Sequence, residues 1–253
     1  MTRSRLIVFE GVAGSGTSTL TRYAGDLLKA RSAPHHVILE GDLEHPADYE
    51  SVTWLPEPGY ADLLCRHPSD AVPIQGSAEP HDGGLLVPYG RLRTAGSVGT
   101  SAHDALAAHD IYELPEPTYR RLALQRWQAF GKQASAEPDI WVLECCLLQI
   151  PITTLLVKHN CDEWVIHEHI RATLDRVIAQ RPTAWCDFFV RYHTQQEYGR
   201  AHQLRGIEGT VRALAARQRL EEDLLMQLPV AAPRIDTSAG WYDAKSILRE
   251  LIG

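Results

Sequence analysis

The stretch from Leu6 to Leu20, LIVFEGVAGSGTSTL, decides the expected fold, because a short apolar run leads into a glycine-rich turn and then into a helical pattern. Glycine adopts backbone conformations that other residues avoid, so such a turn can bring several N–H groups around a phosphate. A helix that starts near Ser18 adds the positive end of its dipole at the same point. We therefore expect a phosphate-binding strand–loop–helix.

Residues 11–18, GVAGSGTS, match the spacing G-x-x-x-x-G-K-[ST] of a nucleotide-binding loop, except that Thr17 replaces the lysine. Ser18 takes the position whose hydroxyl binds Mg²⁺. The lysine normally neutralises charge on the β- and γ-phosphates. Its loss should therefore impair phosphoryl transfer more than nucleotide binding. A glycine-rich turn without a ligand is the alternative. The residues expected to contact the nucleotide are Gly11, Gly14, Ser15, Gly16, Thr17, Ser18 and Thr19.

The composition is that of a folded protein with reduced cysteines. The 253 residues are 44% apolar, which is enough for the core of one α/β domain. The five cysteines show no C-x-x-C spacing, which argues against a disulfide framework or a zinc site and favours a cytoplasmic protein. No run reaches the ~18 apolar residues of a membrane helix, so we expect no membrane partner. The net charge of −7 disfavours nucleic acid as a partner.

Short apolar runs alternate with helical patterns, which indicates βα units and a parallel sheet. The expected strands are Arg5–Glu10, His36–Glu40, Ile140–Leu143, Glu163–His167 and Pro233–Asp236. We expect a single domain over residues 1–253. Residues 56–117, rich in Pro, Gly and His, are expected to be a loop-rich insertion that shapes a substrate pocket.

The motif FEG-x-x-GSG-x-ST at residues 9–19 resembles the opening of thymidylate kinases and deoxynucleoside kinases, members of the P-loop kinase group. This resemblance implies a three-layer α/β sandwich around a five-stranded parallel sheet in the order 2-3-1-4-5. It also implies ATP, or another nucleoside triphosphate, and Mg²⁺ as cofactors. The partner would be a small-molecule acceptor that carries a hydroxyl.

The resemblance also assigns roles farther along the chain. The second strand of the group ends in a carboxylate that contacts the substrate hydroxyl, and here Glu40 and Asp42 are the candidates for catalysis. Glu144 ends the third expected strand, where an acidic residue lies near Mg²⁺. The I-D-x-S sequence that lies near the adenine assigns Asp236 and Ser238 to the nucleotide. A solvated turn, or a purely structural bond, is the alternative for each carboxylate.

In the P-loop kinase group, a mobile lid with spaced arginines follows the fourth strand. The resemblance assigns residues 168–209 to this lid. Nine arginines stand against four carboxylates between Arg171 and Arg219, and a guanidinium group suits a small polyanion. Arg176 and Arg181 are the expected replacements for the missing lysine. Ordinary solvated charges are the alternative. Cys145 occupies the position that usually holds an arginine after the third strand.

Three functions remain open from the sequence. The first is an ATP-dependent kinase that acts on a hydroxyl of a nucleoside, nucleotide or nucleoside-like natural product. The second function is that of a nucleotide-binding pseudokinase without transfer activity, and it follows from Thr17 in place of the lysine. The SGTS sequence at residues 15–18 also resembles the S-G-T-[ST] loop of sulfotransferases, which gives the third. The sequence does not identify the acceptor and does not decide between ATP and GTP. It also leaves the oligomeric state open, with a homodimer among the alternatives.

Overall fold

The computed structural model describes residues 6–10, 16–178, 186–189 and 241–252, together with scattered positions from 216 to 227. The chain forms two compact units. The first contains Met1–Glu40 and Trp127–Gly253, and the second contains Gly41–Arg126. The predicted insertion at residues 56–117 lies inside the second unit.

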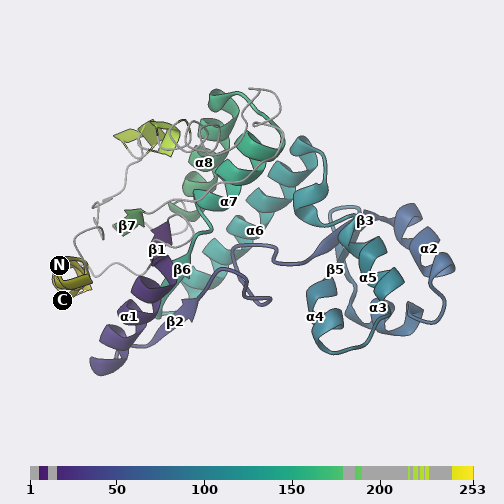
Figure 1. Ribbon diagram of the computed structural model, residues 1–253, viewed down its shortest axis with the longest axis horizontal. Coiled ribbons are helices and arrows are strands. Elements are labelled where there is room, and N and C mark those ends of the chain that lie inside the picture. The colour runs from purple at the N-terminus through teal and green to yellow at the C-terminus, as the bar shows by residue number, and fades with distance from the viewer. Residues whose placement is uncertain are drawn as a thin grey trace. The chain divides into compact units, whose positions relative to one another are not determined.

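A four-stranded parallel sheet forms the centre of the first unit (Figure 1). Its strand order is β2-β6-β1-β7, and the strands are β1 (Leu6–Glu10), β2 (His35–Ile38), β6 (Ile140–Glu144) and β7 (Cys186–Phe189). Strand β1 is buried along its whole length, as expected for an apolar strand between two parallel neighbours. Because Phe9 lies beside Glu144, the ends of β1 and β6 meet at the same edge of the sheet.

Helix α1 (Thr17–Ala30) packs on this sheet through the apolar face that its sequence spacing predicts. Gly16 precedes the helix with a φ of 92°, a left-handed conformation that suits glycine. Farther along, Gly25 faces Val37, and a Cβ atom on this glycine would lie 2.6 Å from Val37 Cγ2. The buried core comprises Ile7, Phe9, Leu20, Ala24, Leu28, Val142, Ala244 and Leu248, the last two from helix α11 (Trp241–Ile252).

Three further helical segments belong to the first unit. These are α7 (Gln149–Ile152), the π-helical stretch η2 (Thr153–Lys158) and α8 (Glu163–Ile178). Helix α6 (Glu116–Ala136) contains the boundary between the two units. Its Phe130 packs edge-to-face on Trp141 of β6, with ring centres 5.3 Å apart.

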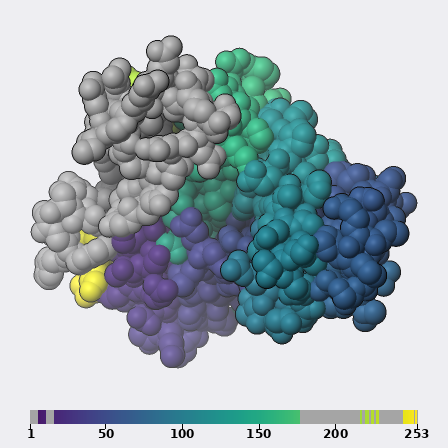
Figure 2. Space-filling view, turned by 45° about the vertical axis from the view of Figure 1, so that its right-hand side comes forward, coloured from purple at the N-terminus to yellow at the C-terminus, as the bar shows by residue number. Residues whose placement is uncertain are grey.

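The second unit is built on a three-stranded antiparallel sheet in the order β3-β5-β4. Its elements are β3 (Thr53–Pro56), α2 (Glu57–Arg66), α3 (Ala71–Ser77), β4 (Glu79–His81), β5 (Gly84–Val87), α4 (Tyr89–Thr94), α5 (Thr100–Ala107) and the 3₁₀ turn η1 (Ile111–Glu113). Asp82 and Gly83 join β4 to β5 with positive φ angles, as a tight hairpin requires. In the space-filling view the blue atoms of α2 and α3 form one dense cluster (Figure 2).

The predicted five-stranded parallel sandwich is wrong. The described sheet has four strands, a separate antiparallel sheet is present, and the predicted loop-rich insertion folds into helices and strands. The first three predicted strands are present as β1, β2 and β6. The predicted strand Glu163–His167 is instead the start of α8, and β7, inside the predicted lid, pairs with β1. The predicted strand Pro233–Asp236 lies outside the described residues.

The error over Glu163–His167 has a clear physical reason. A short apolar run cannot distinguish a buried strand from a helix by its pattern alone. The apolar positions continue at Ile166, Ile170 and Leu174, which are all buried and follow the i, i+4, i+8 spacing of one helical face. Among the described helices, none is both long enough and apolar enough to cross a membrane.

Candidate functional site

Three carboxylates gather where β1, β2 and β6 end. Glu10 is the last residue of β1, Glu144 is the last residue of β6, and Glu40 follows β2 by two residues. Glu10 and Glu144 are each only 1% exposed, whereas Glu40 is exposed. Open parallel sheets bind their ligands at this edge, outside the carboxyl ends of the strands.

Glu144 joins three segments of the chain. The Ser18 hydroxyl, in the first turn of α1, donates to Glu144 Oε1 at 2.6 Å. The Glu40 N–H donates to Glu144 Oε2 at 3.2 Å. The short contact from Ser18 is typical of a hydrogen bond to an ionised carboxylate. A buried carboxylate needs such partners to offset its lost hydration. The structure brings together three of the predicted site residues, Ser18, Glu40 and Glu144.

Glu10 was missed by the sequence analysis, although it is held in a similar way. Its two carboxylate oxygens accept the backbone N–H groups of Leu147, at 2.6 Å, and of Gln149, at 2.8 Å. These bonds fix the chain where α7 begins. The signal that could have found Glu10 is its position, because it ends a buried strand in the same way as Glu144 does.

Gln149 links this network to Glu40. Its amide Nε2 donates to Glu40 Oε1 at 2.7 Å, and the side chain is buried. Its Oε1 atom is also buried, and it accepts no hydrogen bond from the described residues. Gln149 therefore orients the Glu40 carboxylate. No local pattern in the sequence marks this residue, because its role depends on a contact across 109 positions.

Cys145 is a buried thiol among these carboxylates. Its φ of 58° is left-handed, which is uncommon for a residue other than glycine and often marks a functional site. Burial raises the pKa of the Cys145 thiol far above its usual value, and the charges of Glu10, Glu40 and Glu144 raise it further, while a hydrogen bond with Thr17 opposes the shift. The thiol is therefore protonated at neutral pH.

The donor atoms at this edge suit a hard cation. Ligand atoms of Glu40, Glu144 and Cys145 all lie within 4.8 Å of one another. Carboxylate oxygens together with the Ser18 hydroxyl are the type of ligand that Mg²⁺ prefers. A protonated thiol is a poor ligand for the same ion, so Cys145 does not belong to this set.

The structure also describes several of the other predicted site residues. Asp42 belongs to the second unit, where it accepts the N–H of Glu44 at 2.9 Å. Arg176 donates to the Ala172 carbonyl of its own helix, and within the described residues it has no recorded bond to the site. Gly16 precedes α1, and Thr19 is exposed in its first turn. Gly11, Gly14, Ser15, Arg181, Asp236 and Ser238 lie outside the described residues.

Comparison with known proteins identified no relative. No family model, curated protein or solved structure matches the chain. Function is therefore inferred from the side chains that meet at this edge of the sheet.

Proposed function

We propose that the protein is an ATP-dependent kinase that transfers a phosphoryl group to a hydroxyl of a nucleoside, nucleotide or nucleoside-like natural product. The hydrogen bond from Ser18 to Glu144 carries this proposal. It joins the serine of the glycine-rich motif to a buried carboxylate at the end of β6, which is the pairing that a Mg²⁺-bound nucleotide requires.

The start of α1 supports the binding of phosphate. Gly16 precedes this helix, and no side chain among the described residues caps it. The backbone N–H groups of the first turn have no partners within the helix, so they are available to phosphate oxygens. The helix dipole adds positive potential at the same end.

Ser18 and Glu144 are the residues that would hold Mg²⁺. The Ser18 hydroxyl donates its hydrogen bond to Glu144, which leaves the oxygen lone pairs free to face a cation. When bound, Mg²⁺ supplies positive charge that stabilises the transferring phosphoryl group. We assign the ion to Glu144 rather than to Glu40, because Glu144 is the buried carboxylate and needs charge compensation more.

Glu40 is the residue that would act on the acceptor. Its carboxylate is exposed to an incoming molecule, and Gln149 holds it in one orientation. A carboxylate in this position can accept the proton of an attacking hydroxyl. The other predicted candidate, Asp42, accepts the N–H of Glu44 at 2.9 Å.

A direct assay tests the proposal. Purified protein is incubated with ATP, Mg²⁺ and a panel of nucleosides, nucleotides and related hydroxylated compounds, and the phosphorylated product is measured. We expect transfer to at least one member of the panel, and we expect Glu40→Gln to abolish it. Nucleotide binding without transfer to any member would contradict the kinase assignment. A cytoplasmic location would suit a protein that uses ATP and whose four described cysteines form no disulfide.

The second candidate is a nucleotide-binding protein without transfer activity, and Thr17 favours it. Its side chain is only 7% exposed and shares a hydrogen bond with Cys145. A neutral, buried threonine cannot replace the charge of the missing lysine. Sulfotransfer has no supporting observation among the residues that the structure describes.

A further inference from the structure

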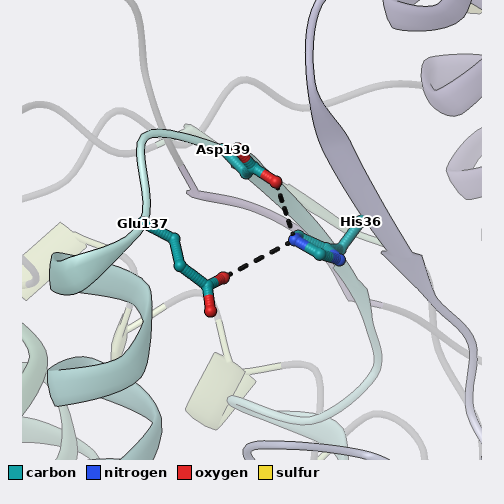
Figure 3. A group of neighbouring side chains, drawn as sticks. All are labelled: His36, Glu137 and Asp139. Atoms are coloured by element: carbon teal, nitrogen blue, oxygen red, sulfur yellow. Dashed lines mark ion pairs between the residues drawn. The ribbon is translucent and has the colours of Figure 1, made fainter.

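A second group of potential metal ligands lies near the amino ends of the strands, away from the Ser18–Glu144 site. His36 lies in the edge strand β2, Asp139 directly precedes β6, and Glu137 directly follows α6. Figure 3 shows the three side chains converging from these elements.

The sheet register explains why these side chains meet. His36 pairs with Trp141 across the parallel strands, so the two side chains lie on the same face. Asp139 lies two residues before Trp141, and the alternation of a strand brings it to that face as well. The His36 ring stacks on Trp141, with centres 4.0 Å apart and planes within 20°, which fixes the orientation of the imidazole.

The connection between α6 and β6 supplies the two carboxylates. It reads Glu137-Pro138-Asp139, and proline restricts both its own backbone and that of the residue before it. The carboxylates are therefore held on a short, stiff segment on either side of one proline. Little conformational freedom would be lost if both bound the same ion.

The distances suit a first-row divalent metal. His36 Nε2 lies 3.0 Å from Asp139 Oδ2 and 3.6 Å from Glu137 Oε2, and the three ligand atoms all lie within 4.8 Å of one another. Three atoms with these separations lie about 2 Å from a common point, which is close to the length of Zn–N and Zn–O bonds.

An ion pair alone explains this arrangement less well. A histidine that simply paired with a carboxylate would direct an N–H group at one oxygen. Instead, His36 Nε2 is shielded from water and makes no hydrogen bond in the described structure, although Asp139 is so close. The three side chains are between 27% and 40% exposed, so water can supply a further ligand.

We propose that His36, Glu137 and Asp139 bind Zn²⁺, with water as the fourth ligand. One imidazole and two carboxylates form a suitable set for this ion, and three protein ligands with one open position are common for it. The ion would connect β2 to the turn that leads into β6. Because the unfolded chain does not preserve this geometry, Zn²⁺ would stabilise the folded protein.

Calorimetric titration of the full chain with ZnCl₂, without nucleotide, tests the proposal. We expect a site with a stoichiometry of one, and we expect His36→Gln and Asp139→Asn each to weaken binding by at least about ten-fold. His35→Gln is the matched control, since His35 is the neighbour on the other face of β2. Glu144→Gln controls for binding at the Ser18–Glu144 site. Neither control should weaken the His36 site.

Two further measurements keep the test decisive if a variant folds poorly. Zn²⁺ should raise the melting temperature of the wild type but not that of Asp139→Asn, with circular dichroism checking the fold of each. Co²⁺ in place of Zn²⁺ should give visible absorption bands that His36→Gln removes. The proposal is overturned if both ligand variants bind Zn²⁺ as tightly as the wild type, or if Glu144→Gln alone weakens binding.

Discussion

Ser18 Oγ donates a 2.6 Å hydrogen bond to Glu144 Oε1, across 126 positions of the chain. This bond joins the first turn of α1 to the end of β6, and Glu144 also accepts the N–H of Glu40. The buried carboxylate of Glu144 thus joins the glycine-rich motif, strand β6 and the loop after β2. The proposed catalytic arrangement depends on this junction.

Replacement of Gln149 should separate the acceptor chemistry from nucleotide binding. In Gln149→Leu the Glu40 carboxylate loses its 2.7 Å partner, so we expect kcat to fall by about ten-fold or more while the affinity for ATP stays nearly unchanged. Steady-state kinetics with ATP and the acceptor varied in turn measure both quantities.

The control for this variant is Ser77→Ala, whose hydroxyl bonds to a carbonyl of its own helix in the second unit. It should leave kcat unchanged. An equal loss of ATP affinity and kcat in Gln149→Leu would show that Gln149 supports the fold rather than the position of Glu40.

Thr17→Lys should distinguish a kinase with a relocated cation from a protein that only binds nucleotide. If another group already neutralises the phosphates, the new lysine should change the transfer rate by less than about three-fold. This change is small beside the rate enhancement that a catalytic cation normally supplies. The rate of phosphoryl transfer under saturating ATP measures this. A large gain of activity would indicate that the wild-type site binds nucleotide without competent transfer.

The second unit should show a pH-dependent stability with opposing contributions. Burial raises the pKa values of Asp48 and Asp110 to about 6, although hydrogen bonds involving Tyr112 and Tyr89 counteract it. Both folded-state values lie above the unfolded value, so these carboxyls contribute stability below pH 4 that is lost as the pH rises through 6. Burial lowers the pKa of His45 to about 4. The neutral imidazole therefore contributes stability above pH 6.5, and this stability is lost as the pH falls from 6.5 to 4.

Between pH 6 and pH 4, therefore, the two carboxyls and His45 act in opposite directions. His45→Gln should expose the carboxyl effect, so that its free energy of unfolding rises by roughly 1 to 3 kcal/mol per carboxyl as the pH is lowered. Urea unfolding at a series of pH values measures this slope. In the double variant His45→Gln/Asp110→Asn, the rise in the free energy of unfolding on acidification should be about half as large. An unchanged rise would show that Asp110 does not titrate in this range.

Gly25→Ala should destabilise the first unit. The new Cβ atom would lie 2.6 Å from Val37 Cγ2, too close for a normal contact, so α1 or β2 must shift. Overpacking of this kind costs about 1 to 3 kcal/mol. Gly76→Ala is the matched control, because no atom lies within 4 Å of its added methyl group. Urea unfolding of both variants measures the difference, and equal stabilities would refute the close packing of α1 on β2.

The sequence predicted those parts of the fold and site that depend on local patterns. Strands β1, β2 and β6 are short apolar runs with clear boundaries, and their parallel arrangement brings Glu40 and Glu144 to the same edge as Ser18. Each of these residues could be placed because it follows a strand or starts a helix. The resemblance to the P-loop kinase group gave Glu40 and Glu144 their expected roles, and the strand ends determine where these two residues lie.

The rest depends on tertiary contacts. The run at Glu163–His167 is helical because its apolar face continues through Ile170 and Leu174, a distinction that five residues cannot make. The role of Gln149 requires a partner 109 positions away. The cluster of His36 with Glu137 and Asp139 depends on the register of two strands, which the sequence does not specify.

Calorimetry of ATP binding with and without Mg²⁺ tests the central claim most directly. We expect ATP to bind the wild type in a Mg²⁺-dependent manner, and we expect Ser18→Ala and Glu144→Gln each to weaken binding by about ten-fold, equivalent to about 1.4 kcal/mol. The surface variant Glu163→Gln should bind as the wild type does. The account is contradicted if ATP does not bind, or if Ser18→Ala and Glu144→Gln bind ATP and respond to Mg²⁺ as the wild type does.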